Sequence, residues 1–285
     1  MPWGVMRGYE ILDSFLLLLL LVGCQAANEP VADAVSPVQV ALVSGDFAVG
    51  RPRVSFALFD GPEPLANVEK VDLSVVEVGA ENATPMWTGT AEGYSDYEVP
   101  YWVAYPELPA AGFWGLAAAI TLDDGTGVEA SFVVEVREES AAPAVGEAAP
   151  ASENRTLESE PDLQKLSSGS DPNPALYQMT VAEAMASGRP TVVGFITPGL
   201  CQTEWCAPVL DSVEAVRADV GEQANFIHVE VYEDFQALTV VDEMAEWGLT
   251  TEPWVFVLDE DGRVVARFNG PLSARELMGA LGPLL

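Results

Sequence analysis

Two cysteines that could carry out redox chemistry lie close together, at positions 201 and 206, with four residues between them. A loop of this length can close into a disulfide if the two Cα atoms come within about 7 Å of each other. Two thiols that pair reversibly support thiol–disulfide exchange, in which one thiolate attacks a disulfide and a second thiol resolves the mixed disulfide. We therefore expect a dithiol site at Cys201 and Cys206.

The residues that follow the second cysteine predict a helix that begins there. Pro208 suits the first turn of a helix, where its missing N–H costs nothing. Val209, Leu210, Val213 and Val216 then recur at helical spacing. Unpaired N–H groups at a helix start favour thiolate over thiol. We accordingly predict that Cys206 is the attacking thiol and that Cys201 resolves the mixed disulfide.

Alternating helix and strand signals surround this site and predict an α/β domain over residues 176–285. Thr180 and Glu183 form the pattern of a capping box at an initial helix, and Ser273 and Glu276 repeat it at the last helix. After the initial helix, the expected order is β-α-β-α-β-β-α, in which the final α is the last helix. The expected strands are Thr191 to Ile196, Phe226 to Val231, Trp254 to Leu258 and Val264 to Phe268, and a further helix is expected from Val241 to Trp247.

This order, with a cysteine-bearing loop after the first central strand and a proline before a hairpin, resembles the thioredoxin family. The pieces that carry the resemblance are Phe195, Trp205-Cys206-Ala207-Pro208, Glu252-Pro253, Asp259-Glu260-Asp261-Gly262 and Gly270. Thioredoxins have Trp-Cys-Gly-Pro-Cys at the active segment, whereas here the fifth place is Val209 and Cys201 lies five residues upstream of Cys206. The resemblance implies a thioredoxin fold and a thiol–disulfide oxidoreductase that needs no cofactor.

The resemblance also implies further site residues. Pro253 matches the proline that takes a cis peptide bond and faces the dithiol, which leaves the backbone of Glu252 free to pair with a substrate peptide. Trp205 and Trp254 are then expected to contact substrate beside it. Counted from Phe195, Cys201 lies one residue beyond the family's first cysteine. The opposite assignment, with Cys201 attacking first, therefore stays open.

His228, the one histidine of the chain, raises the alternative of a copper-handling chaperone. Copper chaperones that share the thioredoxin fold hold their metal with two cysteines and a histidine at the same mouth. Their cysteines are three residues apart, and His228 does not match the position of their histidine. We expect no metal at this site.

The N-terminal residues are typical of an export signal. An apolar run from Phe15 to Val22 follows Arg7, and it is too short to span a bilayer but suits a signal peptide. Leu21-Val22-Gly23-Cys24 resembles the lipobox of bacterial lipoproteins, which implies that residues 1–24 are a signal peptide and lipobox and that Cys24 is acylated. The chain would then be anchored by lipid at the extracytoplasmic face of the cell membrane. An ordinary secretory signal and an uncleaved anchor are the alternatives.

Residues 37–137, after a polar tether over 25–36, predict an all-β, immunoglobulin-like sandwich, so that the fold class is multidomain. Short segments in which apolar and polar residues alternate are separated by turn-forming residues, as in a β-sandwich. The expected strands are Val38 to Val43, Val54 to Phe59, Val71 to Val78, Trp114 to Ile120 and Phe132 to Val136. An aromatic concentration is expected to fill or rim the core, or else to form a recognition surface; its members are Tyr94, Tyr97, Tyr101, Trp102 and Tyr105. Residues 138–175, rich in Ala, Pro, Ser and Glu, predict a flexible linker.

The formal charge of −32 limits the partners. Such a field repels phosphate backbones, so we expect no nucleic acid partner. The sequence predicts a membrane-anchored thiol–disulfide oxidoreductase whose partners are exported proteins with thiols or disulfides. The rival from another class is a non-enzymatic binding lipoprotein in which 201–206 is a structural disulfide.

Overall fold

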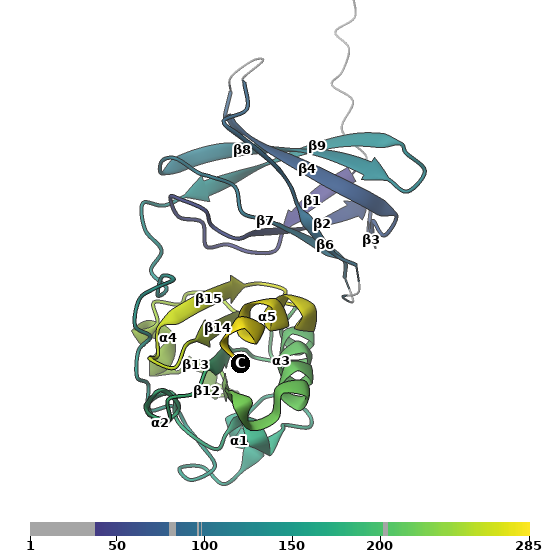
Figure 1. The fold of residues 1–285 in the computed structure, drawn as a ribbon. Helices are drawn as coiled ribbons and strands as arrows, with labels where there is room; N and C mark the ends of the chain where they lie inside the picture. The colour runs from purple at the N-terminus through teal and green to yellow at the C-terminus, as the bar shows by residue number, and fades with distance from the viewer. Residues whose placement is uncertain (1–37, 80–83, 96, 98, 202–204) are drawn as a thin grey trace, which may run out of the picture. The chain divides into compact units, whose positions relative to one another are not determined.

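The computed structural model describes residues 38–79, 84–95, 97, 99–201 and 205–285. From Ser36 to Leu285 the chain forms one compact unit. It contains several β-sheets and few helices (Figure 1). Across these described residues, no helix is long and apolar enough to cross a membrane. Cys24, the signal segment and the tether lie outside the described residues.

Two antiparallel sheets make up residues 38–136. One has the order β1-β2-β7-β6, with β3 paired to β2, and the other has the order β5-β4-β8-β9. The strands are β1 (Val38–Leu42), β2 (Val54–Asp60), β3 (Glu63–Pro64), β4 (Val68–Glu77), β5 (Trp87–Thr90), β6 (Glu92–Tyr94), β7 (Tyr101–Ala104), β8 (Gly112–Leu122) and β9 (Gly127–Val136). Alternate side chains of β4, namely Val71, Leu73 and Val75, are buried in one apolar cluster. The sequence pattern predicted β1, β2, β4, β8 and β9 but not β3, β5, β6 and β7. In β4 the period of two marks the core face.

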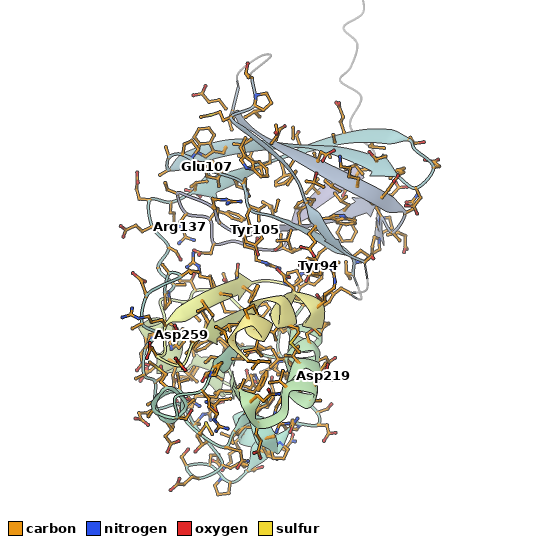
Figure 2. The ribbon with its side chains drawn as sticks, in the orientation of Figure 1. Tyr94, Tyr105, Glu107, Arg137, Asp219 and Asp259 are labelled. Atoms are coloured by element: carbon orange, nitrogen blue, oxygen red, sulfur yellow. A yellow bond between two sulfur atoms is a disulfide. The ribbon has the colours of Figure 1, made fainter. Side chains whose placement is uncertain are left out.

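The aromatic concentration of this region contributes mostly to packing. Tyr94, Tyr97 and Tyr101 are buried in a small cluster with Val103, and Trp102 belongs to the main apolar cluster. Tyr105 is 44% exposed, whereas Tyr94 is buried. Both side chains are labelled in Figure 2. Four of the five aromatic side chains thus fill or rim a core, as the first of the two interpretations predicted.

The C-terminal sheet has the order β11-β10-β14-β15, in which β10 and β11 are parallel and the other pairs are antiparallel. The sheet and the helices around it are, in chain order, α2 (Val181–Ala186), β10 (Thr191–Phe195), α3 (Cys206–Val220), β11 (Asn225–Val229), α4 (Asp242–Glu246), β14 (Trp254–Leu258), β15 (Val264–Asn269) and α5 (Ala274–Leu281). The predicted order of helices and strands is confirmed. A short pair, β12 (Tyr232–Asp234) and β13 (Thr239–Val240), is inserted before α4.

Helices cover both faces of this sheet because its central strands are apolar on both faces. Val192 of β10 packs in a cluster with residues of α3 and α5. The next residue, Val193, packs in a second cluster with residues of α2 and α4. β10 and β14 are buried along their whole length, and β10 leads directly to the cysteine loop.

Residues 138–175 are packed, which differs from the flexible linker that their composition predicts. Ala142 and Ala149 are buried in the cluster that contains Trp247. The indole Nε1 of Trp247 donates a hydrogen bond of 2.9 Å to Ser152 Oγ. Further along, α1 (Leu163–Leu166) places Leu166 in the cluster of α3 and α5. Apolar residues show no regular spacing in this segment, because its few apolar side chains each pack separately against the sheet domain.

A buried ion pair joins the first and last parts of the compact unit. Arg53 Nε donates to Glu276 Oε1 at 2.8 Å, and each side chain is 6% exposed. The hydroxyl of Tyr101 donates to Glu276 Oε2 at 2.9 Å and accepts from the backbone N–H of Ser273 at 2.8 Å. The capping box predicted at Ser273 and Glu276 is therefore half right. Ser273 caps the backbone N–H of Glu276, but Tyr101 replaces the Glu276 carboxylate as the acceptor for Ser273.

Candidate functional site

The two cysteines lie where β10 gives way to α3. Ile196 and Thr197 are buried directly after β10, and the chain then reaches the surface at Gly199 and Leu200. Cys206 is the first residue of α3, and Trp205 precedes it as the N-cap without a side-chain capping bond. The prediction that Cys206 stands at a helix start is confirmed. The N–H groups of that first turn are available to stabilise negative charge near the Cys206 sulfur.

Cys201 and Cys206 form a disulfide with a Cα–Cα separation of 6.1 Å. Cys206 is completely buried, and it packs with Val209 and Val213 in the cluster of α3 and α5. Cys201 is partly exposed. Of the two cysteines, Cys201 is therefore the one that an incoming group can approach. This difference in exposure disfavours the prediction that Cys206 attacks first and favours the opposite assignment.

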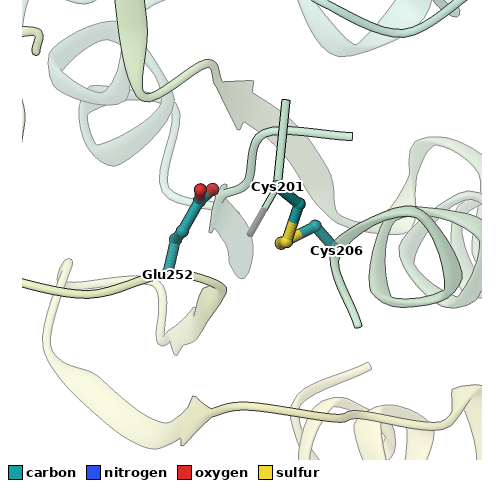
Figure 3. A group of neighbouring side chains, drawn as sticks. All are labelled: Cys201, Cys206 and Glu252. Atoms are coloured by element: carbon teal, nitrogen blue, oxygen red, sulfur yellow. A yellow bond between two sulfur atoms is a disulfide. The ribbon is translucent and has the colours of Figure 1, made fainter. Parts of the chain in front are cut away.

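The carboxyl group of Glu252 lies beside this disulfide (Figure 3). The carboxylate oxygen and the two sulfur atoms all lie within 4.8 Å of one another. Glu252 is followed by Pro253 across a cis peptide bond, and both the cis bond and its position beside the cysteines are as predicted. In this structure the two sulfurs are bonded to each other.

Burial changes the acidity of Glu252. Loss of water around the carboxyl group raises the pKa of Glu252 to about 7, and the negative charge of Glu230 adds to this rise. Hydrogen bonds from the side chain and the backbone of Thr197 act in the opposite direction on the pKa of Glu252. Its Oε2 atom is buried and has no hydrogen-bond partner among the described residues. A carboxyl group in these surroundings exchanges its proton near neutral pH.

An open cavity of about 410 Å³ runs from Cys201 and Glu252 along the inserted β12–β13 pair. Its wall is mostly apolar; it is lined by Cys201, Val231, Tyr232, Val240, Met244, Leu249, Thr250, Thr251 and Glu252. Cys201 therefore lies at the edge of a groove that can take the apolar side chain of a bound polypeptide.

The two predicted tryptophan contacts have different surroundings. Trp205 is partly buried and stacks on Tyr97, with ring centroids 6.0 Å apart. Trp254 is 4% exposed and stacks on Phe256 inside the cluster that faces α2 and α4. The prediction that Trp254 contacts substrate does not fit this burial. A strand residue next to Pro253 points away from the cysteine side of the sheet and into the core.

His228 is engaged away from the sulfurs. Its Nδ1 lies 2.5 Å from the hydroxyl of Tyr177, and its Nε2 lies 2.7 Å from the carbonyl oxygen of Ile196. Burial lowers the pKa of His228, against the opposing charge of Glu230. Because both ring nitrogens have hydrogen-bond partners, the copper-chaperone arrangement of two cysteines and a histidine is not formed.

Sequence reasoning missed the side chains of Glu252 and Glu230. Only the backbone of Glu252 was expected at the site. Its side chain could have been suspected because a carboxyl residue stands immediately before an apolar strand, next to the proline of the resemblance. Glu230, Thr197 and Ser168 come from separate segments, so their contact depends on the tertiary fold.

Comparisons with known proteins give distant likenesses only. No model of a known protein family matches the chain, and no curated protein matches it either. Among solved structures, StoA from Bacillus subtilis is 20% identical over 32% of this chain and 81% of its own, with a TM-score of 0.27. CopC from Methylosinus trichosporium is 20% identical over 35% of this chain and 94% of its own, with a TM-score of 0.25. The soluble domain of PmoD from Methylocystis is 13% identical over 35% and 88%, also at 0.25. At these TM-scores the likenesses carry no argument about function.

Proposed function

We propose that the chain is an extracytoplasmic thiol–disulfide oxidoreductase that acts on exported proteins through Cys201 and Cys206. In this proposal residues 176–285 are a thioredoxin-like domain, and residues 37–137 are an immunoglobulin-like sandwich. The order of the helices and strands, the disulfide at the end of β10, and the cis Glu252-Pro253 bond beside it all support the assignment.

The observation that carries the proposal is the unequal burial of the two cysteine residues. A partly exposed Cys201 at the edge of a groove can be attacked by a client thiolate, while a buried Cys206 is released as the leaving group. We accordingly assign Cys201 as the cysteine that bonds to the client and Cys206 as the resolving cysteine. A disulfide with both sulfurs buried would not offer this division of labour.

Trapping tests both the activity and the assignment. In the full chain, Cys206→Ser leaves the exposed thiol without its resolving partner. It should therefore accumulate a mixed disulfide with a peptide that carries one internal disulfide, seen by mass spectrometry after alkylation. The matched variant Cys201→Ser should trap little. Wild-type chain that has first been reduced with dithiothreitol and desalted should reduce the peptide without a lasting adduct, and its own disulfide should re-form. Equal failure of both variants to trap would refute the proposed activity, and trapping by Cys201→Ser alone would reverse the assignment.

We also propose that Cys24 is acylated and holds the protein at the extracytoplasmic face of the cell membrane. The lipobox-like Leu21-Val22-Gly23-Cys24 sequence supports this. Wild-type protein should sediment with membranes and carry lipid on its mature N-terminus, while Cys24→Ala should be released or left unprocessed. Recovery of Cys24→Ala from the membrane fraction at the wild-type level, with a cleaved signal, would contradict acylation.

A further inference from the structure

A second, smaller groove shares Thr251 and Glu252 with the groove of about 410 Å³ described above. Its volume is about 170 Å³. Trp205 and Pro253 form part of its wall, so this groove also borders the redox site. The wall is completed by residues 42–45, which are the end of β1 and the start of the loop that follows it. The first sheet of the sandwich therefore contributes directly to the surroundings of the dithiol.

Hydrogen bonds hold residues 42–45 against the loop that contains the cis bond. The backbone N–H of Gly45 donates to Asn269 Oδ1 at 2.8 Å. Asn269 Nδ2 in turn donates to the carbonyl oxygen of Pro253 at 3.3 Å and to Thr251 Oγ1 at 3.4 Å. Asn269 is buried, so water competes little for these bonds. The wall therefore has a fixed position relative to the loop.

The backbones of the wall and of this loop region also meet at Gly270. Its N–H donates to the carbonyl oxygen of Pro253 at 3.1 Å. The φ angle of Gly270 is 87°, in the left-handed region that favours glycine. A Cβ atom at this position would overlap the carbonyl oxygen of Val43. Because no side chain fits between them, the wall lies in direct contact with the backbone next to the loop.

The sandwich also holds Trp205, the residue before Cys206. Trp205 packs against the small aromatic cluster of the sandwich, where it stacks on Tyr97. Tyr97 meets the ring of Tyr101 edge-on, with centroids 5.2 Å apart, and the hydroxyl of Tyr101 is bonded to the first turn of α5. Two parts of the groove wall are thus fixed by the sandwich.

A client backbone can approach the two grooves at Thr251 and Glu252. Within the described part of the chain, neither residue makes a hydrogen bond to another backbone group. An extended peptide that pairs here directs successive side chains to opposite sides. When the client cysteine faces Cys201, which lines the larger groove, the two neighbours of that cysteine face away from the larger groove. The smaller groove is the space that remains for them.

We propose, on the basis of the function proposed above, that residues 42–45 of the sandwich determine which clients are accepted. Clients are extended segments in which the residues next to the cysteine are small, because the smaller groove admits no bulky side chain. A larger apolar side chain two positions from the cysteine occupies the larger groove. This proposal gives the sandwich a part in client selection.

Peptide thiols of graded size test the proposal. The full chain carrying Cys24→Ala, in its disulfide form, is mixed with an excess of uncharged peptides that contain one cysteine between two Gly, two Ala, two Leu or two Trp residues. One peptide thiolate bonds to Cys201 Sγ and Cys206 leaves as a thiolate. A second peptide thiolate attacks the bound peptide sulfur, so that Cys201 is released and a peptide disulfide forms. The two peptide thiols are oxidised, and their protons pass through the solvent to the two cysteines.

The rate of disulfide opening is followed by alkylation and mass spectrometry. Each rate is divided by the rate of the same peptide with oxidised glutathione, which corrects for differences between the peptide thiols. The corrected rate should be at least roughly tenfold lower with Trp than with Gly neighbours, since a misfit of one methylene group already gives a factor of about ten.

Three variants connect this preference to the wall. Leu42→Ala enlarges the smaller groove at a side chain that is 37% exposed, and should raise the rate of the Trp peptide with little effect on the Gly peptide. Gly45→Val should lower the rates of the Ala and Leu peptides. The added Cβ would meet Asn269 Oδ1 at 4.0 Å and is tolerated. Val133→Ala, at a half-exposed position of β9 that lines neither groove, should keep the wild-type preference.

Two results would overturn the proposal. Equal corrected rates for all four peptides would show that the smaller groove does not select clients. If Leu42→Ala and Gly45→Val keep the wild-type order and spacing of rates, the preference arises elsewhere in the site. An excess of peptide thiol opens the disulfide even in a chain that does not turn over client proteins. The size preference can therefore be measured whether or not the proposed function holds.

Discussion

At the scale of single residues, the two cysteines differ in burial: Cys206 is completely buried and Cys201 is partly exposed. The sequence did not indicate this difference. The helix signal at Pro208 placed Cys206 correctly at the start of α3, and from it we expected Cys206 to attack first. Burial could not be inferred, because it depends on α5 and on Leu166, which lie far from Cys206 in sequence. The position of Glu252-Pro253 could be predicted from the resemblance, but the unusual acidity of Glu252 could not. Burial raises the pKa of Glu252 and the negative charge of Glu230 adds to the rise, while Thr197 acts against it; all of these depend on the tertiary fold.

The acidity of Glu252 predicts how stability depends on pH. Its pKa is about 7 in the folded protein, above the ordinary value of 4.5. The folded state therefore binds more protons than the unfolded state between these values, and the free energy of unfolding should fall as the pH rises across this window. Urea titrations at pH 5 and pH 8 check this. Glu252→Gln should lose less stability than the wild type between the two pH values, and an equal loss in both proteins would contradict the assigned pKa.

At the scale of elements, the regular patterns were informative and the irregular segment was not. Strands with a clear period of two and helices with caps were predicted from sequence, and Thr180 with Glu183 forms the expected capping box. Short strands such as β6 and β7 carry too few residues to show a period. Residues 138–175 lack a period because they pack through isolated side chains such as Ala149 and Leu166.

The capping box at α2 gives a direct stability prediction. Thr180 Oγ1 accepts from the N–H of Glu183 at 3.1 Å, and the Glu183 carboxylate accepts from the N–H of Thr180 at 2.9 Å. Thr180→Ala should lower the free energy of unfolding by about 1 kcal/mol, while Thr180→Ser, which keeps the acceptor, should change it little. Urea unfolding of the two variants provides the measurement. Equal stability of Thr180→Ala and Thr180→Ser would show that the cap does not contribute.

The packing of residues 138–175 predicts resistance to proteolysis. Arg155 donates to the carbonyl oxygen of Tyr232 at 3.2 Å, and its neighbours Asn154 and Thr156 are buried. Trypsin should therefore leave the bond after Arg155 intact in the native protein and cleave it once urea unfolds the chain. Mass spectrometry of timed digests distinguishes the cases. Rapid native cleavage at Arg155 would support the flexible linker that the composition suggested.

At the scale of the whole molecule, one of the few cationic side chains is almost completely buried. The chain has 12 basic residues against 44 acidic ones, yet Arg53 is enclosed and paired with Glu276. Arg53 also donates to the backbone carbonyl oxygens of Asn269 and Pro271, at 3.0 and 2.8 Å. Composition predicted a highly acidic surface but could not show this pair, whose members are 223 positions apart in sequence.

Breaking this pair should be costly. Arg53→Met removes the cation that pairs with the buried Glu276 carboxylate. The hydroxyl of Tyr101 and the first turn of α5 remain beside that carboxylate. The free energy of unfolding should therefore fall by about 3–5 kcal/mol. The double variant Arg53→Met with Glu276→Gln removes both charges and should cost less than Arg53→Met alone. A double variant that is as unstable as the sum of the single variants would show that the two side chains do not interact.

The central claim is that the Cys201–Cys206 disulfide exchanges rather than serving as a permanent structural link. It is tested most directly by equilibrating the full chain, with Cys24→Ala to remove the third thiol, in a series of dithiothreitol redox buffers. The fraction of disulfide is then counted by alkylation and mass spectrometry. For an exchanging disulfide we expect a reduction potential above about −300 mV, as found for labile and catalytic disulfides. A potential below about −300 mV would mark a structural bridge and contradict the proposed function.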